Sequence, residues 1–405
     1  MKNKKKNTWI KFRHTVIRNL AYIVLYTYSR IKYGITIKKH KEKKPRQYLI
    51  LFNHQTAFDQ FFVGMAFKRP VYYLASEDLF SNGWISSIIR YIVAPIPIKK
   101  QTADVQAIIN CIRVAKEGGT IALAPEGNRT YSGRTEYMSP TIAPLAKKMK
   151  LPIALYRIEG GYGVQPRWSD VVRKGKMQAY VYRVIEPEEY ADMTNEELFD
   201  IIKEGLYLDE CKADAEFYHK KNAEYLERVF YVCPFCGLSK FESCNDTVKC
   251  TACSREIKYL PTKEFEGVGF EFPFRFTSEW YDYQQNFMND LAPDDYIDEP
   301  LFSDRARMSE VIVYKKKILM HKNAEIRLYG DRITVTPEDG EETVYRFDDI
   351  GTVTVLGKNK LNIYYGNNLY QLKGDKRFNA LKYVNTFFRY SNVKKGAEYD
   401  QFLGL

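Results

Sequence analysis

A histidine and an aspartate stand five residues apart in the run Asn-His-Gln-Thr-Ala-Phe-Asp, residues 53–59. Within one α-helix, five residues turn the side chain by about 500°, so His54 and Asp59 would point roughly 140° apart. The apolar run 48–52 predicts a buried strand, and the stretch from Thr56 to Asp59 resembles a capping box that opens a helix. We therefore expect His54 on a strand-to-helix turn, with the Asp59 carboxylate able to reach back to it.

This arrangement would supply a general base. The carboxylate would hold one imidazole N–H and fix the tautomer, and the other ring nitrogen would take a proton from an attacking hydroxyl. An unperturbed histidine has a pKa of about 6.5, and bases of this kind accelerate reactions by about 10²–10⁴. The competing interpretation is that Asp59 only caps its helix and that His54 is an ordinary turn residue.

A second polar turn, Pro-Glu-Gly-Asn-Arg-Thr, follows at residues 125–130, after the apolar run 120–124 that also predicts a buried strand. Gly127 permits a tight turn that exposes backbone N–H groups. The planar guanidinium of Arg129 can bind a phosphate through two parallel hydrogen bonds. A surface ion pair between Glu126 and Arg129 is the alternative. Each motif ends a predicted strand, and their combination in this order is the specific signal.

The two motifs resemble NHxxxxD and EGTR of the glycerolipid acyltransferases, of the lysophosphatidic acid acyltransferase type. The resemblance covers roughly residues 45–210, with Asn128 in place of the threonine of EGTR. The run 94–100 resembles a further block of that family, but Lys100 replaces the usual arginine and lacks its fork. The run Leu-Pro-Ile-Ala at 151–154 resembles the final block.

The resemblance implies an α/β catalytic domain whose mixed sheet is flanked by helices. It implies transfer of a fatty acyl group from acyl-CoA or acyl-ACP to a lysophospholipid hydroxyl, with 1-acylglycerol 3-phosphate favoured and phosphatidic acid as the product. His54 would be the base and Asp59 would orient it. The predicted substrate-binding residues are Glu126, Gly127, Asn128, Arg129 and Lys100. The alternative is a membrane-associated scaffold or lipid-binding protein on a degenerate acyltransferase fold, against which the intact motifs argue.

The chain of 405 residues carries a net charge of +12, which favours nucleic acid or an anionic membrane as partner. Apolar residues recur at helical spacing within the basic segment 1–44, namely at Trp9, Phe12, Val16, Leu20 and Ile23. The uncharged run 19–29 is far shorter than the roughly 20 residues needed to span a bilayer. We expect an amphipathic helix in the interface, on the cytoplasmic face of the cell membrane, with no transmembrane helix and no secretory signal. The alternative is that this helix packs on the protein's own core.

Four of the seven cysteines form two Cys-x-x-Cys pairs, Cys233 with Cys236 and Cys250 with Cys253. Four thiolates in this layout predict a closed tetrahedral site for structural Zn²⁺, with iron in a rubredoxin-like site as the rival. Zinc ribbons often touch nucleic acid, but no basic, aromatic stripe surrounds these pairs. Nucleic acid is therefore an unfavoured partner.

Residues beyond 300 change to a period of two, which predicts about seven short strands, the first at 311–314, followed by one helix. This order resembles a pleckstrin-homology (PH) or GRAM-like barrel, a kind of domain that often binds lipid headgroups or proteins; a structural or dimerising role is the alternative. The predicted domains are a basic membrane-contact segment 1–44, an acyltransferase domain closed by a helical stretch 195–230, a zinc ribbon, a linker and the barrel. Their predicted bounds are 1–44, 45–230, 231–258, 259–302 and 303–392.

Overall fold

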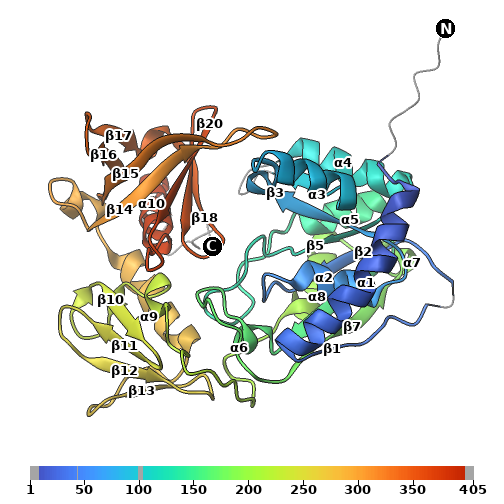
Figure 1. The fold of residues 1–405 in the computed structure, drawn as a ribbon, viewed down its shortest axis with the longest axis horizontal. Coiled ribbons are helices and arrows are strands. Elements are labelled where there is room, and N and C mark those ends of the chain that lie inside the picture. Colours follow the sequence, from blue (N-terminus) through green and yellow to red (C-terminus); the bar gives the residue numbers. More distant parts are fainter. Residues whose placement is uncertain (1–8, 43, 99–103, 397–405) are drawn as a thin grey trace, which may run out of the picture. The chain divides into compact units, whose positions relative to one another are not determined.

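The computed structural model describes residues 9–42, 44–98 and 104–396, and these divide into two compact units (Figure 1). The first unit comprises the described residues up to Arg129 together with 135–161 and 176–208. The second comprises 130–134, 162–175 and the described residues from Asp209 onward. Two short segments from the first half of the chain therefore belong to the second unit.

The first unit is built on a mixed sheet, seven-stranded in the described part of the chain, in the order β1-β7-β6-β2-β5-β3-β4. Neighbouring strands are parallel except β6 and β7, which are antiparallel. All four residues of the central strand β2 are buried, as its continuous apolar sequence predicts. The strands are β1 (Ile35–Ile37), β2 (Leu49–Phe52), β3 (Val71–Ser76), β4 (Ile96–Ile98), β5 (Thr120–Leu123), β6 (Ile153–Glu159) and β7 (Met177–Ile185).

Helices flank this sheet, which confirms the predicted α/β class (Figure 1). The Asp104 side chain caps α4 by accepting a hydrogen bond from the Ala107 N–H. A capping box between Thr194 and Glu197 opens α8, which ends at Leu206, well short of the helical stretch predicted to reach residue 230. The helices are α1 (Phe12–Tyr33), α2 (Asp59–Ala66), η1 (Glu77–Phe80), α3 (Trp84–Val93), α4 (Val105–Lys116), α5 (Ile142–Met149), α6 (Gly161–Val164), α7 (Pro187–Tyr190) and α8 (Asn195–Leu206).

The second unit contains the cysteine-bearing ribbon. A hairpin of β8 and β9 precedes an antiparallel sheet in the order β10-β11-β12-β13. The segment 259–302, predicted as a linker, instead contains β13 and α9. Its aromatic residues belong to the core or pack against it: Trp280 is fully buried and stacks on Phe230, with ring centroids 3.7 Å apart, whereas Phe270, Phe272 and Phe274 are partly buried. The elements are η2 (Leu226–Arg228), β8 (Val232–Cys233), β9 (Gly237–Leu238), β10 (Phe241–Cys244), β11 (Thr247–Cys250), β12 (Glu256–Tyr259), β13 (Phe265–Gly267), α9 (Thr277–Asp290) and η3 (Pro293–Tyr296).

The C-terminal part of this unit is a curled antiparallel sheet in the order β17-β16-β15-β14-β20-β19-β18, followed by α10. The predicted order of seven strands and one helix is therefore present. Its core continues into that of the ribbon, because residues of both belong to one buried apolar cluster. The elements are β14 (Phe302–Glu310), β15 (Ile318–Leu328), β16 (Arg332–Pro337), β17 (Thr343–Arg346), η4 (Phe347–Asp349), β18 (Ile350–Leu356), β19 (Lys360–Tyr365), β20 (Asn368–Gly374) and α10 (Leu381–Lys395).

Candidate active site and metal centre

His54 lies in the turn between β2 and α2, and its Nδ1 is 2.8 Å from Oδ2 of Asp59. Asp59 is the first residue of α2 and is fully buried, whereas the His54 side chain is 25% exposed. The aspartate reaches back across the turn because the helix starts at residue 59 itself. The structure therefore brings together the two residues that the sequence analysis assigned to the base.

The Asp59 carboxylate is held by the turn that it follows. Its Oδ2 accepts hydrogen bonds from the backbone N–H groups of Gln55, at 2.7 Å, and Thr56, at 2.9 Å. Its Oδ1 accepts from the Thr56 hydroxyl at 2.6 Å. These donors stabilise the buried charge and fix the position of the carboxylate before any ligand binds. The orientation of the imidazole is thus set by the protein.

Glu126 connects the second motif to the first. Its Oε1 accepts a hydrogen bond from the backbone N–H of His54 at 2.9 Å, across a separation of 72 residues. Burial raises the pKa of this carboxyl to about 8, so it is mostly protonated at neutral pH. A carboxyl group in this place positions the His54 backbone, and it would repel a phosphate whenever it is ionised. This contact therefore does not support the phosphate-binding role that was predicted for Glu126.

The rest of the second motif forms a tight turn after β5. Gly127 has φ 70° and donates its N–H to the Ala124 carbonyl at 3.0 Å. Asn128 and Arg129 follow it, and both are buried. Burial raises the pKa of Tyr33 to about 12; the charge of Asp59 acts in the same direction and that of Arg129 opposes it. Tyr33 therefore has both Asp59 and Arg129 in its surroundings.

Lys100 lies outside the residues that the structure describes. Gln55 was not singled out by the sequence analysis, although it follows His54 directly. Within the described part of the chain, its fully buried side-chain amide has no hydrogen-bond partner on either the oxygen or the nitrogen. A Cβ atom at Gly161 would come within 2.6 Å of the Gln55 Cβ, so this side chain packs on the glycine turn after β6.

The four paired cysteines meet in the ribbon, with all sulfur atoms within 4.8 Å of one another. The Sγ atoms of Cys233 and Cys253 are 3.7 Å apart, and those of Cys236 and Cys250 are 3.5 Å apart. A tetrahedral metal with bonds of about 2.3 Å to sulfur requires sulfur–sulfur distances of roughly 3.8 Å. The cluster can therefore hold a metal ion. Cys244 is exposed on β10, outside the cluster.

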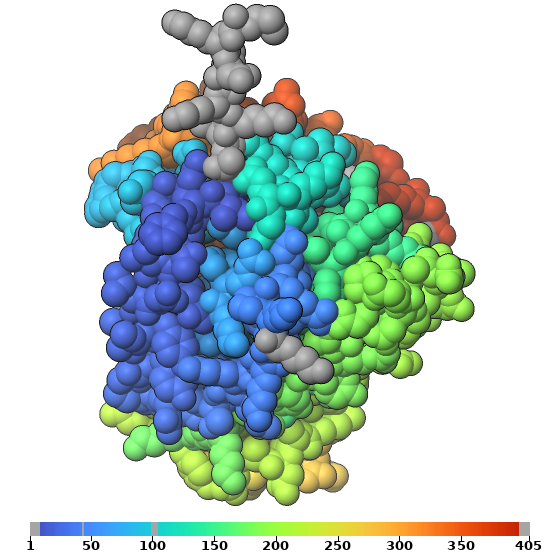
Figure 2. All heavy atoms as spheres, turned by 90° about the vertical axis from the view of Figure 1, so that its right-hand side faces the viewer, coloured from blue at the N-terminus to red at the C-terminus, as the bar shows by residue number. Residues whose placement is uncertain are grey.

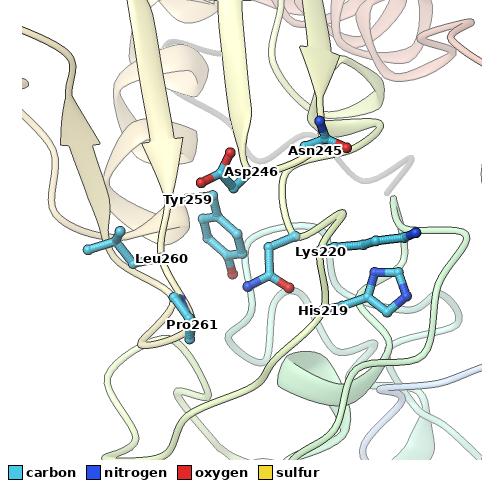
Figure 3. Close-up of a pocket in the computed structure, with 8 residues that line it drawn as sticks. His219, Lys220, Asn245, Asp246, Tyr259, Leu260 and Pro261 are labelled. Carbon is cyan, nitrogen blue, oxygen red and sulfur yellow. The ribbon is translucent and has the colours of Figure 1, made fainter.

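A shallow pocket in the second unit is distinct from both sites (Figure 3). Asn245 and Asp246, in the turn between β10 and β11, and Tyr259, at the end of β12, form part of its wall. His219 and Lys220 also line the pocket. None of the residues that the sequence analysis assigned to catalysis or metal binding lines this pocket.

Residues 35–157 match the family model described as Acyltransferase, and this region contains both motifs. The chain is 25% identical over 171 residues to a 1-acyl-sn-glycerol-3-phosphate acyltransferase of Bacillus subtilis (strain 168), which covers 41% of this chain and 82% of the relative. It is 22% identical over 202 residues to the chloroplastic 1-acyl-sn-glycerol-3-phosphate acyltransferase BAT2 of Brassica napus, covering 49% of this chain and 57% of that relative.

Two solved structures show weaker likenesses. The 1-acyl-sn-glycerophosphate acyltransferase PlsC from Thermotoga maritima aligns with a TM-score of 0.38 and 21% identity, covering 47% of this chain and 74% of that one. The N-terminal PH domain of human ARAP2 aligns with a TM-score of 0.21 and 13% identity, covering 24% of this chain and 87% of that one.

Proposed function

We propose that the chain moves a fatty acyl group from acyl-CoA or acyl-ACP to the free hydroxyl of 1-acylglycerol 3-phosphate, because residues 35–157 match the Acyltransferase family model and a 1-acyl-sn-glycerol-3-phosphate acyltransferase is 25% identical to it. The product would be phosphatidic acid. The observation that carries this proposal is the His54–Asp59 pair, joined to the Arg129 turn through the hydrogen bond between Glu126 and the His54 backbone.

In the proposed reaction, His54 takes the proton of the acceptor hydroxyl as its oxygen attacks the thioester carbonyl. Nδ1 is engaged by Asp59, so the proton goes to Nε2, and the buried carboxylate stabilises the imidazolium that forms. A new C–O bond forms, the C–S bond breaks, and the imidazolium returns the proton to the departing thiolate. No covalent acyl-enzyme is needed, so no cysteine takes part.

The turn after β5 is the proposed phosphate site. Arg129 supplies a permanent positive charge and a planar fork of donors. Gly127 shapes the turn, and Asn128 adds a short amide where the family motif has threonine. In this proposal Glu126 acts on the phosphate only indirectly, by fixing the backbone between the base and the arginine.

The membrane is the proposed place of work, since the acceptor is a lipid. No helix in the described part of the chain is long and apolar enough to cross a bilayer. Helix α1 lies on the surface of the first unit (Figure 2). It exposes much of the predicted apolar stripe, and its sequence contains no acidic residue. Cations beside exposed apolar side chains suit the headgroup region of an anionic membrane. The exposed members of the stripe are Phe12, Val16, Leu20 and Ile23.

Structural Zn²⁺ is the proposed ion of the cysteine cluster. Four thiolate ligands leave no open coordination position, so the metal would contribute folding energy and take no part in acyl transfer. Metal analysis of the purified protein tests this assignment. One zinc per chain is expected, and iron in its place would give a coloured protein and overturn the choice of metal.

The deciding experiment is coenzyme A release from palmitoyl- and oleoyl-CoA, with 1-acylglycerol 3-phosphate and other lysophospholipids as acceptors. We expect acceptor-dependent release that falls by about 10²–10⁴ in His54→Ala, with an unchanged melting temperature. His321→Ala, on β15 of the second unit, is the matched control and should keep full activity. Full activity in His54→Ala would refute the mechanism. If acyl-CoA gives no release with any acceptor, acyl-ACP is the donor to test next.

A further inference from the structure

Helix α3 has its apolar side turned outward. Trp84, Ile85, Ile88 and Tyr91 are 72%, 46%, 47% and 61% exposed. The buried residue of this helix is Ser86, whose hydroxyl donates to the Leu79 carbonyl at 2.7 Å. An ordinary surface helix shows the opposite arrangement, with its apolar stripe facing the core. The outward stripe is therefore a feature that folding of the first unit does not explain.

The stripe of α3 continues that of α1. The Trp9 indole, just before α1, donates to the Ala94 carbonyl at the end of α3 at 2.8 Å. The Arg13 guanidinium donates to the Tyr91 carbonyl at 3.0 Å and lies 4.1 Å from the centre of the Tyr91 ring. The start of α1 and the end of α3 are thus in contact, and exposed Phe12 lies one residue from this junction.

We propose that α3 is a second membrane-contact helix, which lies with α1 in the headgroup region of an anionic bilayer. This inference rests on the proposed membrane association and extends it to a part of the catalytic unit that the sequence analysis did not consider. Trp84 and Tyr91 stand near the two ends of α3, about 10 Å apart along its axis. Tryptophan and tyrosine prefer the membrane–water interface, so this pair fits a helix lying in the membrane plane.

The positive charge of α1 and α3 favours an anionic bilayer over an uncharged apolar partner. Neither α1 nor α3 contains an acidic residue, and Arg13, Arg30 and Lys32 on α1 and Arg90 on α3 are basic. A face of this composition suits anionic headgroups above and acyl chains below. An acidic protein such as acyl carrier protein would use the same charges, and the experiment below separates the two partners.

Trp84 is a built-in probe for this contact. Of the four tryptophans, Trp168 and Trp280 are fully buried and Trp9 is partly buried. The full-length protein is mixed with phosphatidylcholine vesicles, with and without phosphatidylglycerol, that carry bromine on the acyl chains. We expect blue-shifted and quenched emission with the anionic vesicles. Trp84→Phe should lose most of the quenching while still floating with the vesicles. Equal quenching in Trp84→Phe, or unquenched emission from vesicle-bound protein, would overturn the proposal.

Affinity supplies an independent test. The double variant Ile85→Glu/Ile88→Glu should bind anionic vesicles about tenfold more weakly or worse, because two apolar contacts become desolvated charges. Val268→Glu is the control, since Val268 is 46% exposed in the second unit and should not affect binding. Unchanged vesicle affinity in the double variant would contradict the proposal. The proposal would also be contradicted if the double variant bound acyl carrier protein more weakly but bound vesicles as well as wild type does.

The outcomes are distinguishable from those of the proposed enzyme activity. The double variant should lose more activity on vesicle-embedded acceptor than on detergent-dispersed acceptor. Quenching of Trp84 in a protein with no acyl transfer to any acceptor would refute the proposed function and leave the membrane role of α3 standing. Full activity on vesicles with no quenching of Trp84 would do the reverse.

Discussion

The turn after β2 and the cysteine cluster of the ribbon both gather reactive side chains from short stretches of sequence, but they are held in different ways. Asp59 is surrounded by donors from its own turn, so its position needs nothing from outside. The cysteine sulfurs face one another at 3.5 and 3.7 Å, an arrangement that only a shared cation stabilises once they ionise. The carboxylate beside His54 is thus held by hydrogen bonds within the protein, whereas four ionised thiolates would need a metal ion to hold them together.

The largest expected effect comes from breaking the cysteine cluster, for which we propose a bound zinc ion. Zinc contributes about 10–16 kcal/mol to comparable small units, which matches or exceeds the stability of a typical domain. Cys250→Ser should therefore lose the metal and the cooperative unfolding of the second unit, as seen by metal analysis and calorimetry. Cys244→Ser, an exposed cysteine on the same ribbon, should keep both. A stable Cys250→Ser protein with the wild-type melting temperature would show that the cluster is not metal-dependent.

The next effect concerns the hydrogen-bonded side. Asp59→Asn turns one acceptor oxygen into an amide that meets N–H donors, so the imidazole loses its fixed orientation. We expect activity to fall by about 10² or more and the free energy of unfolding to fall by about 1–3 kcal/mol. Asp104→Asn is the control, because asparagine also caps a helix and Asp104 caps α4. Turnover of Asp59→Asn equal to that of wild type would leave Asp59 as a helix residue only.

A third effect should follow pH. Burial raises the Glu126 pKa from 4.5 to about 8, so the folded state binds this proton more tightly than the unfolded chain does. The stabilisation is complete below the unfolded pKa and is lost as the pH rises through 8. Melting curves between about pH 5 and pH 9 should show wild type losing stability relative to Glu126→Gln, which keeps an acceptor for the His54 N–H. Parallel curves would mean that Glu126 does not titrate in this range.

The smallest effect is expected for an exposed ion pair whose hydrogen-bond distances are as short as those around Asp59. Arg46 and Glu186 form a two-pronged ion pair, with one contact of 2.9 Å, but both side chains are more than a third exposed. A double-mutant cycle with Arg46→Ala and Glu186→Gln should give a coupling of at most about 1 kcal/mol, decreasing with salt. If this coupling equalled the loss of unfolding free energy in Asp59→Asn, burial would not explain why the two sites differ in strength.

The sequence was sufficient to predict contacts between residues that lie close together in the chain. The rotation of a helix excluded His54 and Asp59 from one helix, and the structure places them on a turn and a helix start, in contact. The spacing of the cysteines was enough to predict their cluster. The contact of Glu126 with the His54 backbone joins residues far apart in the chain, and no local pattern encodes it.

The hydrophobic pattern is a weaker guide to which residues are buried, because it does not say which face of an element packs against the core. An amphipathic surface helix ordinarily turns its apolar stripe to the core, yet Trp84, Ile88 and Tyr91 of α3 are exposed. The apolar run 311–314 was predicted to be the first strand of the barrel. It lies instead in the hairpin after β14, where Tyr314 has φ 67°. The actual strand alternates charged Arg305 and Arg307 with buried Ala306 and Met308, which is the pattern of a half-exposed strand.

The two segments of the first half that belong to the second unit set an order of events during synthesis. Tyr131 and Trp168 share a core with residues from Ala223 onward, which the ribosome makes later. Translation adds about 5–20 residues per second, so the stretch directly after Arg129 waits seconds for its packing partners. The sheet of the first unit is complete by residue 185. A nascent chain would therefore contain every strand of this sheet while the flank of its second motif still lacks the residues that it packs against.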